Sequence, residues 1–244
     1  MTSPGLILAT DLDGTFLGGP KSARHALYES LAARQDVRLI FVTGRDIEFI
    51  RALIAQPGIP RPHYIIGDVG TTVLDGRDFR PVASIQSDIA ARWGDATDRV
   101  TALLENEPGL ELQPTPFRYR VSYYYDPACL SADTVRKVEA AGFDCLLSAD
   151  TYLDVLPRGI AKGATLLRLL DELAMPHDRV LVAGDTLNDL SLFQTGLKGV
   201  AVGNSEPALL DAVADFPWVH RSPWPGAAGI TDALRHFCMK EETT

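Results

Sequence analysis

Short apolar segments alternate with helical patterns over both ends of the chain. The segments LILAT (6–10) and RLIFV (38–42) are apolar along almost their whole length, which is typical of strands buried on both faces of a parallel sheet. The pattern predicts strands at 6–10, 38–42, 63–67, 179–184 and 199–203, and helices at 22–35, 46–56, 161–174, 189–195, 206–214 and 228–237. This order predicts an α/β fold with a doubly wound, Rossmann-like parallel sheet.

The middle of the chain has a different pattern. The predicted elements are a long amphipathic helix at 87–106, a half-exposed antiparallel strand at 118–126 (RYRVSYYYD), a helix at 131–141, and paired strands at 143–149 and 151–157. They predict an α+β unit at 81–158, inserted into a core that consists of 1–80 and 159–244.

Length and charge exclude some classes of function. The chain of 244 residues fits one large domain or two small ones. It has 23 Lys and Arg against 32 Asp and Glu, a net charge of −9. This balance argues against a general nucleic-acid or anionic-membrane binder, because such proteins carry basic patches. An anionic small substrate remains compatible, because a local site can be positive or carry a metal.

Cysteine usage and the N-terminal sequence predict a cytoplasmic protein. Cys129, Cys145 and Cys238 are scattered and form no C-x-x-C pair, so neither a disulfide framework nor a zinc site is indicated. The N-terminal segment lacks the basic region of a signal peptide, and no stretch approaches the roughly 18 apolar residues of a membrane span. A reducing compartment is the simplest setting.

Reactive polar residues follow three predicted strands, at the point where each strand ends. These residues are Asp11 and Asp13, then Thr43-Gly44-Arg45, then Asp185 to Asp189. Ligands of open parallel sheets bind beyond the carboxyl ends of the strands. If these strands are neighbours, the three groups meet at one edge of the sheet.

The acids among them predict a metal-assisted reaction. Asp11 and Asp13 are two apart in an extended segment and lean to the same side. With Asp185 and Asp189 they form a dense negative cluster, which is unfavourable unless one acid is protonated or a cation lies among them. Oxygen ligands with room for water favour Mg²⁺. Beside Mg²⁺ and a phosphate, one carboxylate can act as nucleophile while the other transfers protons.

Four motifs in this chain resemble those of the haloacid dehalogenase (HAD) superfamily of phosphohydrolases. DLDGT and VTGR follow strands, Lys162-Gly163 opens a helix, and GDTLND follows a later strand, in the order of the superfamily. The insertion resembles its type IIB cap, a lid over the active site. RVSYYYDP, LDVLPRGIAKGA and VLVAGDTLNDLSLF are similar to the sucrose-phosphate phosphatase branch, which includes mannosylfructose-phosphate phosphatases. This closer resemblance covers most of the chain.

The resemblance implies catalytic roles for the first three motifs. It implies that Asp11 is the nucleophile and that Asp13 is the general acid and base, with a main-chain carbonyl that also binds Mg²⁺. Thr43 is implied to hydrogen-bond a phosphoryl oxygen, and Gly44 beside it to bind the substrate. Lys162 is implied to neutralise charge on the transferring phosphoryl group, since phosphoryl transfer depends mostly on electrostatic positioning.

The resemblance also implies a magnesium site. Asp185 is expected to bind Mg²⁺ directly, and Asp189 to bind it through water or to hold its shell. Asn188 is expected to support the phosphate or the loop beside it. The implied metal-binding residues are therefore Asp11, Asp13, Asp185 and Asp189.

Two polar residues near the motifs have alternative interpretations. Arg45 either binds substrate or pairs with Asp68 or another surface acid. Asp68 follows the predicted strand 63–67 near the start of the insertion, where it either contacts substrate or stabilises the loop. Thr43, taken alone, fits a helix N-cap as well as a phosphate ligand.

Four residues of the predicted strand at 118–126 are candidates for substrate contact. Arg118 and Arg120 share one face, where they either reach an anionic or polyhydroxyl substrate or form a solvated strand face. Tyr123 and Tyr125 also share a side. Packing within the strand is the main expectation for these tyrosines, and sugar stacking is the alternative.

The combined prediction is a Mg²⁺-dependent phosphatase that hydrolyses a sugar phosphate monoester through an aspartyl-phosphate on Asp11. Sucrose 6-phosphate is the first expected substrate, with mannosylfructose phosphate, a glucosylglycerol-type phosphate or a broad range of sugar phosphates as alternatives. A phosphotransferase or phosphomutase and a non-catalytic regulatory relative are the other classes considered. The expected partners are the small-molecule sugar phosphate and a glycosyltransferase that makes it, with no nucleic acid and no membrane.

Overall fold

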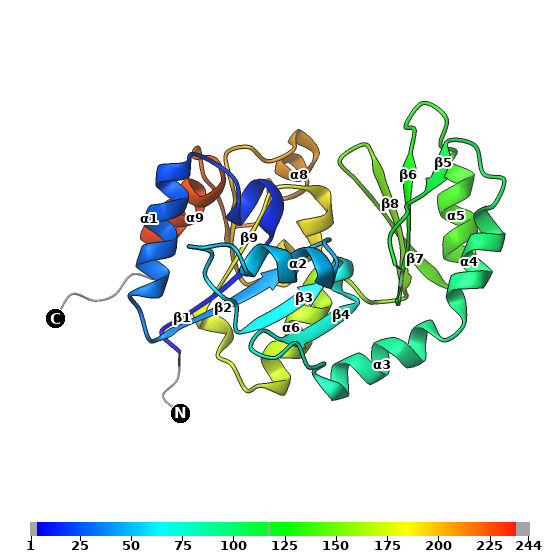
Figure 1. Ribbon diagram of the computed structural model, residues 1–244. Coiled ribbons are helices and arrows are strands. Elements are labelled where there is room, and N and C mark those ends of the chain that lie inside the picture. Colours follow the sequence, from blue (N-terminus) through cyan, green and yellow to red (C-terminus); the bar gives the residue numbers. More distant parts are fainter. Residues whose placement is uncertain (1–3, 117, 238–244) are drawn as a thin grey trace.

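A seven-stranded sheet forms the centre of the larger part of the molecule (Figure 1). The computed structural model describes residues 4–116 and 118–237. The strands, in spatial order, are β11 (Val219–Arg221), β10 (Lys198–Ala201), β9 (Val180–Gly184), β1 (Leu6–Thr10), β2 (Val37–Val42), β3 (Tyr64–Gly67) and β4 (Thr72–Asp75). All neighbouring pairs are parallel except β3 and β4.

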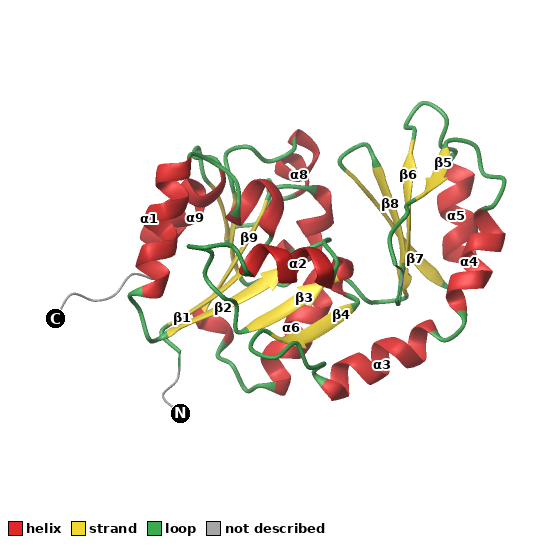
Figure 2. Cartoon of the chain, viewed as in Figure 1, coloured by secondary structure: helices red, strands yellow, loops and turns green. Residues whose placement is uncertain are grey.

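Helices cover both faces of this sheet (Figure 2). One face packs against α1 (Lys21–Ala32), α2 (Ile47–Ile54) and α9 (Gly226–His236), and the other against α3 (Ala83–Trp93), α6 (Lys162–Glu172), α7 (Leu190–Phe193) and α8 (Pro207–Ala212). Successive residues of β1 divide between the two faces, because a strand projects alternate side chains to opposite sides: Leu6 and Leu8 join one buried cluster, Ile7 and Ala9 the other. The predicted doubly wound α/β fold is confirmed.

The smaller part of the molecule is an antiparallel sheet covered on one face by two helices. Its strands, in spatial order, are β5 (Leu110–Leu112), β6 (Val121–Tyr125), β8 (Tyr152–Pro157) and β7 (Phe143–Ser148). The covering helices are α4 (Ala96–Leu104) and α5 (Ala132–Ala140). Figure 1 shows these helices on the side of the small sheet away from the core, so its other face is turned toward the core.

Three strands were not expected from the sequence. β4, β5 and β11 have four, three and three residues. Each lies at the edge of its sheet, and segments this short show too little periodicity to be recognised. β6 is also shorter than predicted, because it begins at Val121. Arg118 and Arg120 therefore precede the strand, and their predicted position on a strand face is wrong.

The predicted helix at 87–106 is divided into two helices, α3 and α4. The break falls at Gly94, whose φ of +55° and ψ of −121° lie outside the helical region. The two helices bury their apolar faces in different places: Ile85 and Ile89 of α3 pack on the large sheet, whereas Val100 and Leu104 of α4 pack on the small one. The domain bounds at 81 and 158 remain a prediction, and α3 packs on the core side.

The chain enters and leaves the small domain at adjacent points. Arg92, in the last turn of α3, donates a hydrogen bond to the carbonyl of Arg158, one residue after β8, at 3.4 Å. Cys129 and Cys145 are free thiols, whereas Cys238 and residues 1–3 lie outside the described range. Among residues 4–116 and 118–237, no helix has the length and apolar character needed to cross a membrane.

Candidate active site

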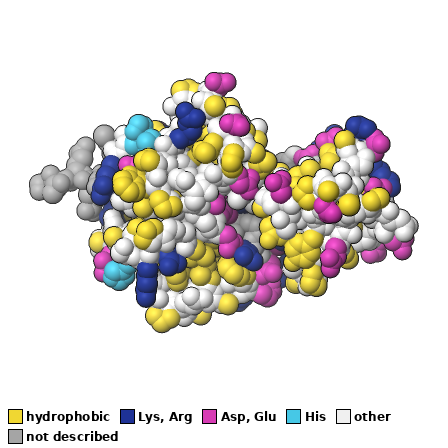
Figure 3. Space-filling model, turned by 90° about the horizontal axis from the view of Figure 1, so that it is seen from above, with side chains coloured by type: hydrophobic (Ala, Val, Ile, Leu, Met, Phe, Trp, Pro, Cys, Tyr) yellow, Lys and Arg dark blue, Asp and Glu magenta, His cyan; other side chains and the backbone are white. Residues whose placement is uncertain are grey.

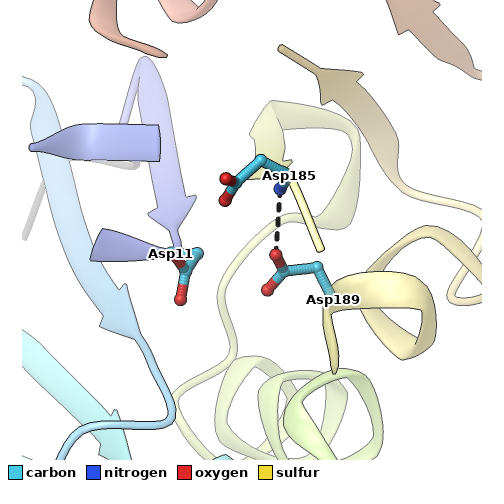
Figure 4. Close-up of side chains that lie close together, drawn as sticks. All are labelled: Asp11, Asp185 and Asp189. Atoms are coloured by element: carbon cyan, nitrogen blue, oxygen red, sulfur yellow. Dashed lines mark hydrogen bonds between the residues drawn. The ribbon is translucent and has the colours of Figure 1, made fainter. Parts of the chain in front are cut away.

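Three buried aspartates converge where the central strands end (Figure 4). Asp11 follows β1, and Asp185 follows its hydrogen-bonded neighbour β9. Asp189 lies one turn further along the chain than Asp185. One carboxylate oxygen from each lies within 4.8 Å of the others. The structure thus brings together three of the four acids expected at the metal site.

Lys162, at the start of α6, is fully buried against this cluster. Its ammonium donates hydrogen bonds to Asp11 Oδ1 at 2.9 Å, to Asp189 Oδ1 at 2.7 Å and to the side-chain oxygen of Asn188. Burial by itself lowers the pKa of Lys162, but the negative charges of Asp11 and Asp189 outweigh this and raise it. Lys162 is therefore positively charged and neutralises part of the cluster.

The cluster nevertheless carries excess negative charge. Burial raises the pKa of Asp11 well above its ordinary value; Lys162 lowers it in part, and Asp189 and Asp185 raise it further. Burial, followed by the charge of Asp189, raises the pKa of Asp185 to about 7. Like-charged carboxylates in low dielectric favour either a bound proton or a cation. The all-oxygen donor set therefore fits a hard divalent cation.

The three acids do not contribute equally to such a site. Asp189 Oδ1 accepts from Lys162, and its Oδ2 accepts from the backbone N–H groups of Asp185 (3.0 Å) and Thr186 (3.2 Å). An ammonium and two backbone N–H groups thus engage Asp189, which places it to hold the loop. Among the described residues, the Asp185 carboxylate accepts only from neutral side chains, those of Thr15 and Asn204, so it and Asp11 are the better direct ligands. Both roles expected of Asp189, binding of the metal through water and support of its shell, stay predictions.

Asn204 is a site residue that the sequence analysis missed. Its side-chain amide donates to Asp185 Oδ2 at 3.2 Å and to the Gly14 carbonyl at 3.1 Å, and its oxygen accepts from the N–H of Gly226 at 2.8 Å. Thr15 donates to the other oxygen of Asp185 at 2.7 Å. The available signal was a polar residue just past the predicted strand 199–203, at the same edge of the sheet as the motifs.

Asp13 lies apart from the three buried acids. Its half-exposed carboxylate forms a two-point ion pair with Arg45, with Nε–Oδ2 at 2.7 Å and Nη2–Oδ1 at 3.1 Å. Of the two interpretations of Arg45, the structure shows pairing with an acid, which is Asp13 and not Asp68. The side chain of Asp13 lines the cavity described below, while its roles as general acid and base and the metal role of its main-chain carbonyl stay predictions.

Thr43 and Gly44 form the turn after β2. Thr43 is buried, and its hydroxyl oxygen accepts the N–H of Arg45 at 3.2 Å. Thr43 lies beside Gly44 at the edge of the cavity but is not part of its lining, and its role as a phosphate ligand stays a prediction. Gly44 has no side chain, which leaves its backbone open toward the cavity that it lines.

A cavity of about 270 Å³ separates this edge of the core from the small sheet. Its core-side lining is Asp11, Asp13, Gly44, Arg45, Val69, Thr186 and Asn188, and its cap-side lining is Gln113, Thr115, Arg120, Tyr124, Ser148, Ala149, Tyr152 and Asp154. In Figure 3, acidic and basic side chains gather at the notch between the larger and smaller lobes. Arg118 does not line the cavity; its Nη2 lies 3.7 Å from Oε1 of Glu48.

The tyrosines on the cavity differ from those expected. Tyr123 is buried among the side chains that α4 and α5 cover, so its alternative role in sugar stacking is wrong. Tyr125 packs against the same cluster and does not line this cavity. Tyr124 projects to the opposite face, where its ring lies 5.9 Å from that of Tyr152. Both rings line the cavity and are about 40% exposed. Alternation predicted which tyrosines share a face, but not which face meets the core.

The cap side also carries polar groups that can form further hydrogen bonds. Thr115 has a buried hydroxyl with no hydrogen-bond partner in the described structure. Gln113 lies beside it and donates to the Tyr123 carbonyl at 3.2 Å, which leaves its side-chain oxygen as an acceptor. An aromatic surface flanked by donors and acceptors is the chemistry that binds a polyhydroxyl ligand.

Known proteins can be aligned with this chain over nearly its whole length. The model of the sucrose-6F-phosphate phosphohydrolase family matches residues 4–238. A glucosylglycerol-phosphate synthase from Pseudomonas anguilliseptica is 43% identical over 95% of this chain, which spans only 31% of that longer protein. A mannosylfructose-phosphate phosphatase from Agrobacterium fabrum is 29% identical over 96% of this chain and 97% of its own length.

The fold comparison agrees with the sequence comparison. The sucrose-phosphatase of Synechocystis sp. PCC6803, solved with sucrose and phosphate, superposes with a TM-score of 0.87 at 27% identity. The match covers 96% of this chain and 98% of that one. The predicted membership is thus confirmed: the chain belongs to the sucrose-6F-phosphate phosphohydrolase family of HAD-like hydrolases.

Proposed function

We propose that this chain is a phosphatase that hydrolyses the phosphate monoester of a small glycoside. The observation that carries the proposal is a single cavity of about 270 Å³ with Asp11 on one wall and a polar, aromatic cap surface on the other. Asp11 and Lys162 supply chemistry suited to phosphoryl transfer, and Tyr124 and Tyr152 supply a surface suited to a sugar ring. Sucrose 6-phosphate is the first candidate substrate.

In the proposed first step, a carboxylate oxygen of Asp11 attacks phosphorus and the bond from phosphorus to the sugar oxygen breaks. Asp13 donates a proton to the departing oxygen. Lys162, 2.9 Å from Asp11, orients the nucleophile and offsets the negative charge around it. Thr43 donates its free hydroxyl proton to a phosphoryl oxygen.

In the second step, water attacks phosphorus of the aspartyl-phosphate, Asp13 accepts the proton of this water, and inorganic phosphate leaves with Asp11 regenerated. Asp13 must be free for both transfers, although Arg45 holds both of its oxygens here. A phosphate dianion entering the cavity competes for Arg45, and this exchange releases Asp13 next to the leaving oxygen. The released carboxylate takes up a proton from solvent, gives it to the leaving oxygen, and regains one from the attacking water in the second step. We therefore propose both roles for Arg45: it pairs with Asp13 in the free protein, and it binds the phosphate when the substrate enters.

We propose that the cation is Mg²⁺, held by carboxylate oxygens of Asp11 and Asp185. When bound, such an ion supplies electrostatic stabilisation of a phosphoryl oxygen. Asp189 and Asn204 keep Asp185 in position, as their hydrogen bonds to its N–H and to its carboxylate indicate. Gly14 leaves room for this arrangement, because a Cβ there would lie 2.0 Å from Asp185 Oδ2.

A panel of phosphate esters tests the proposal. Phosphate release is measured with sucrose 6-phosphate, mannosylfructose phosphate, glucosylglycerol phosphate and p-nitrophenyl phosphate, each with Mg²⁺ and with excess chelator. We expect one glycoside phosphate to have the highest kcat/KM and chelation to stop turnover reversibly. Equal slow turnover of all esters would instead indicate a broad-specificity phosphatase. Transfer to a second sugar would indicate a phosphotransferase, and no release at all would contradict the proposal.

Glucosylglycerol phosphate is the second candidate substrate. The supporting observation is the 43% identity to a protein named for the synthesis of this compound, of which this chain matches 31%. We further propose that a glycosyltransferase supplies the substrate, because a phosphorylated glycoside must be assembled before it is dephosphorylated. The free thiols Cys129 and Cys145 support a cytoplasmic location for this chain. Co-purification of the two proteins, with a coupled assay, tests the partnership.

A further inference from the structure

Arg120 lies at the junction of the small sheet and the core, and it is buried. One terminal nitrogen, Nη1, donates to Asp154 Oδ1 of β8 at 2.8 Å. The other, Nη2, donates to the carbonyl of Gly44 at 3.1 Å and lies 3.3 Å from Asp68 Oδ1. One guanidinium therefore joins a cap strand to two separate turns of the core.

The contact with Gly44 acts on the turn that the mechanism uses for phosphate. The peptide unit between Gly44 and Arg45 is held at both ends: its carbonyl accepts from Arg120, and its N–H donates to the Thr43 hydroxyl oxygen at 3.2 Å. Because this peptide plane is fixed, the N–H of Arg45 occupies one particular lone pair of the Thr43 hydroxyl oxygen. The direction in which Thr43 can donate its proton is thereby restricted.

The contact with Asp68 supports the same turn from the other side. The N–H of Asp68 donates to the Arg45 carbonyl at 3.0 Å, and the N–H of Val69 donates to the Thr43 carbonyl at 3.1 Å. Asp68 and Val69 have φ values of +52° and +58°, which side-chain-bearing residues rarely adopt, β-branched ones least of all. Such a conformation persists only when its surroundings hold it, and Arg120 pairs directly with the Asp68 carboxylate.

The charges around Arg120 argue against direct phosphate binding by this residue. Both of its terminal nitrogens are engaged by protein acceptors, and two carboxylates face one guanidinium. The hydroxyl of Ser122 also donates to Asp154, which fixes the cap-side partner. A phosphate dianion placed here would meet net negative charge, whereas the guanidinium of Arg45 is paired, among the described residues, with one carboxylate only, that of Asp13.

We infer that Arg120 is a positioning residue: it braces the Thr43–Arg45 turn from the cap through Gly44 and Asp68, and so sets phosphate affinity without touching the substrate. The inference rests on the proposed function for its kinetic consequence, but phosphate binding tests it independently. It also gives Asp68 a role, as the core-side anchor of the brace.

The test compares Arg120→Met with Arg136→Met, an exposed arginine of α5 that pairs only with Asp133 among the described residues. Binding of inorganic phosphate is measured by calorimetry with Mg²⁺ present. Kinetics are measured with the best sugar phosphate and with p-nitrophenyl phosphate. For Arg120→Met we expect weaker phosphate binding and a loss of kcat/KM on the order of tenfold to a hundredfold with both esters, as small misplacements of a binding group produce. Arg136→Met should match the wild type.

Two results would overturn the inference. If only the KM for the sugar phosphate rises, with p-nitrophenyl phosphate and inorganic phosphate unaffected, Arg120 is a sugar ligand. If only the melting temperature falls, with binding and kinetics unchanged, its role is limited to stability. Should Arg120→Met fail to fold, Asp68→Asn and Arg120→Lys provide the same comparison, since neither side chain can restore the paired contacts. Failure of the proposed function would appear differently, as a wild type that binds phosphate but hydrolyses no ester.

Discussion

The two walls of the cavity differ in how firmly their side chains are held. On the core wall, Asp11 and Asn188 are backed by buried side chains that have several partners each: Lys162 contacts three acceptors, and both oxygens of Asp189 are engaged. On the cap wall, Tyr124 and Tyr152 are about 40% exposed, and the Thr115 hydroxyl has no partner in the described structure. The core wall is preorganised for one reaction, whereas the cap wall presents groups that still have bonds to make.

This difference assigns the chemical step to the core wall and the choice of substrate to the cap wall. Preorganised charges stabilise a transition state because they need not reorient during the reaction. Exposed aromatic rings and polar groups without a hydrogen-bond partner contribute the most binding free energy when a ligand covers them. Substitutions on the core wall should therefore change the rate with every phosphate ester, and those of the exposed rings on the cap wall should discriminate between esters. Arg120 belongs with the core wall in this respect, because it braces a turn of the core.

The largest expected effect is at Asp11. Asp11→Asn should lower kcat on the order of 10⁴-fold or more with all esters, because an amide cannot form the acyl-phosphate. Phosphate release and mass-spectrometric trapping of the phosphorylated chain measure it. Circular dichroism should show an unchanged fold, and near wild-type turnover would refute the nucleophile assignment.

Substitutions on the cap wall should have a smaller and selective effect. Tyr124→Ala or Tyr152→Ala should raise the KM for the preferred sugar phosphate by about two- to tenfold, the equivalent of losing one aromatic contact. The KM for p-nitrophenyl phosphate should change less. Leu112→Ala, an exposed apolar residue of the same sheet outside the cavity lining, is the matched control. Equal losses with both esters would remove the distinction between the walls.

The excess charge of the core wall predicts a pH effect on stability in metal-free protein. Between about pH 4 and 7, folded Asp185 keeps a proton that the unfolded chain has lost, because burial raises its pKa to about 7. The free energy of unfolding therefore falls as pH rises through this range. Asp185→Asn should be more stable than the wild type at pH 8 in chelator, by several degrees at roughly 2–4 °C per kcal/mol.

This difference between Asp185→Asn and the wild type should vanish near pH 4, where the acid is protonated in both states. Added Mg²⁺ should raise the melting temperature of the wild type more than that of the variant, because binding to the folded state stabilises it. Thermal denaturation across pH, with and without Mg²⁺, measures both effects. A variant less stable than the wild type at pH 8 in chelator would contradict the charge argument.

The smallest expected effect lies between the two regions, at Gly94. Gly94→Ala forces a side chain into φ +55°, so we expect a loss of about 1 kcal/mol, or roughly 2–4 °C in melting temperature. Gly58→Ala, at φ +85° in open space, is a control for the same backbone penalty within the core. A gain in stability from Gly94→Ala would mean that one continuous helix is preferred.

The sequence predicted the core wall well for a physical reason. Strands buried on both faces are apolar throughout, so β1, β2 and β9 stood out, and the polar residues at their ends were assigned to one edge of the sheet. The convergence of Asp11, Asp185 and Asp189 follows from the adjacency of β1 and β9.

The cap and the junction were less predictable because they depend on tertiary contacts. The break at Gly94 reflects two helices that pack on different sheets, which a shared helical pattern does not reveal. Alternation paired Tyr123 with Tyr125, but only the packing of α4 and α5 determines that Tyr124 faces the cavity. The ion pair of Arg120 with Asp68 joins residues 52 positions apart, beyond any local signal.

The hydrogen bond between Arg92 and the Arg158 carbonyl has an evolutionary consequence. The chain that leaves the core and the chain that returns to it meet at this hydrogen bond. The gap between them in the core is therefore the same whatever polypeptide is inserted between Arg92 and Arg158. Another insert with equally close ends could replace this one while β1 and β9 remain paired and the acids at their ends stay in register. New specificities can therefore arise by exchange or drift of the insert, without rebuilding the chemistry beneath it.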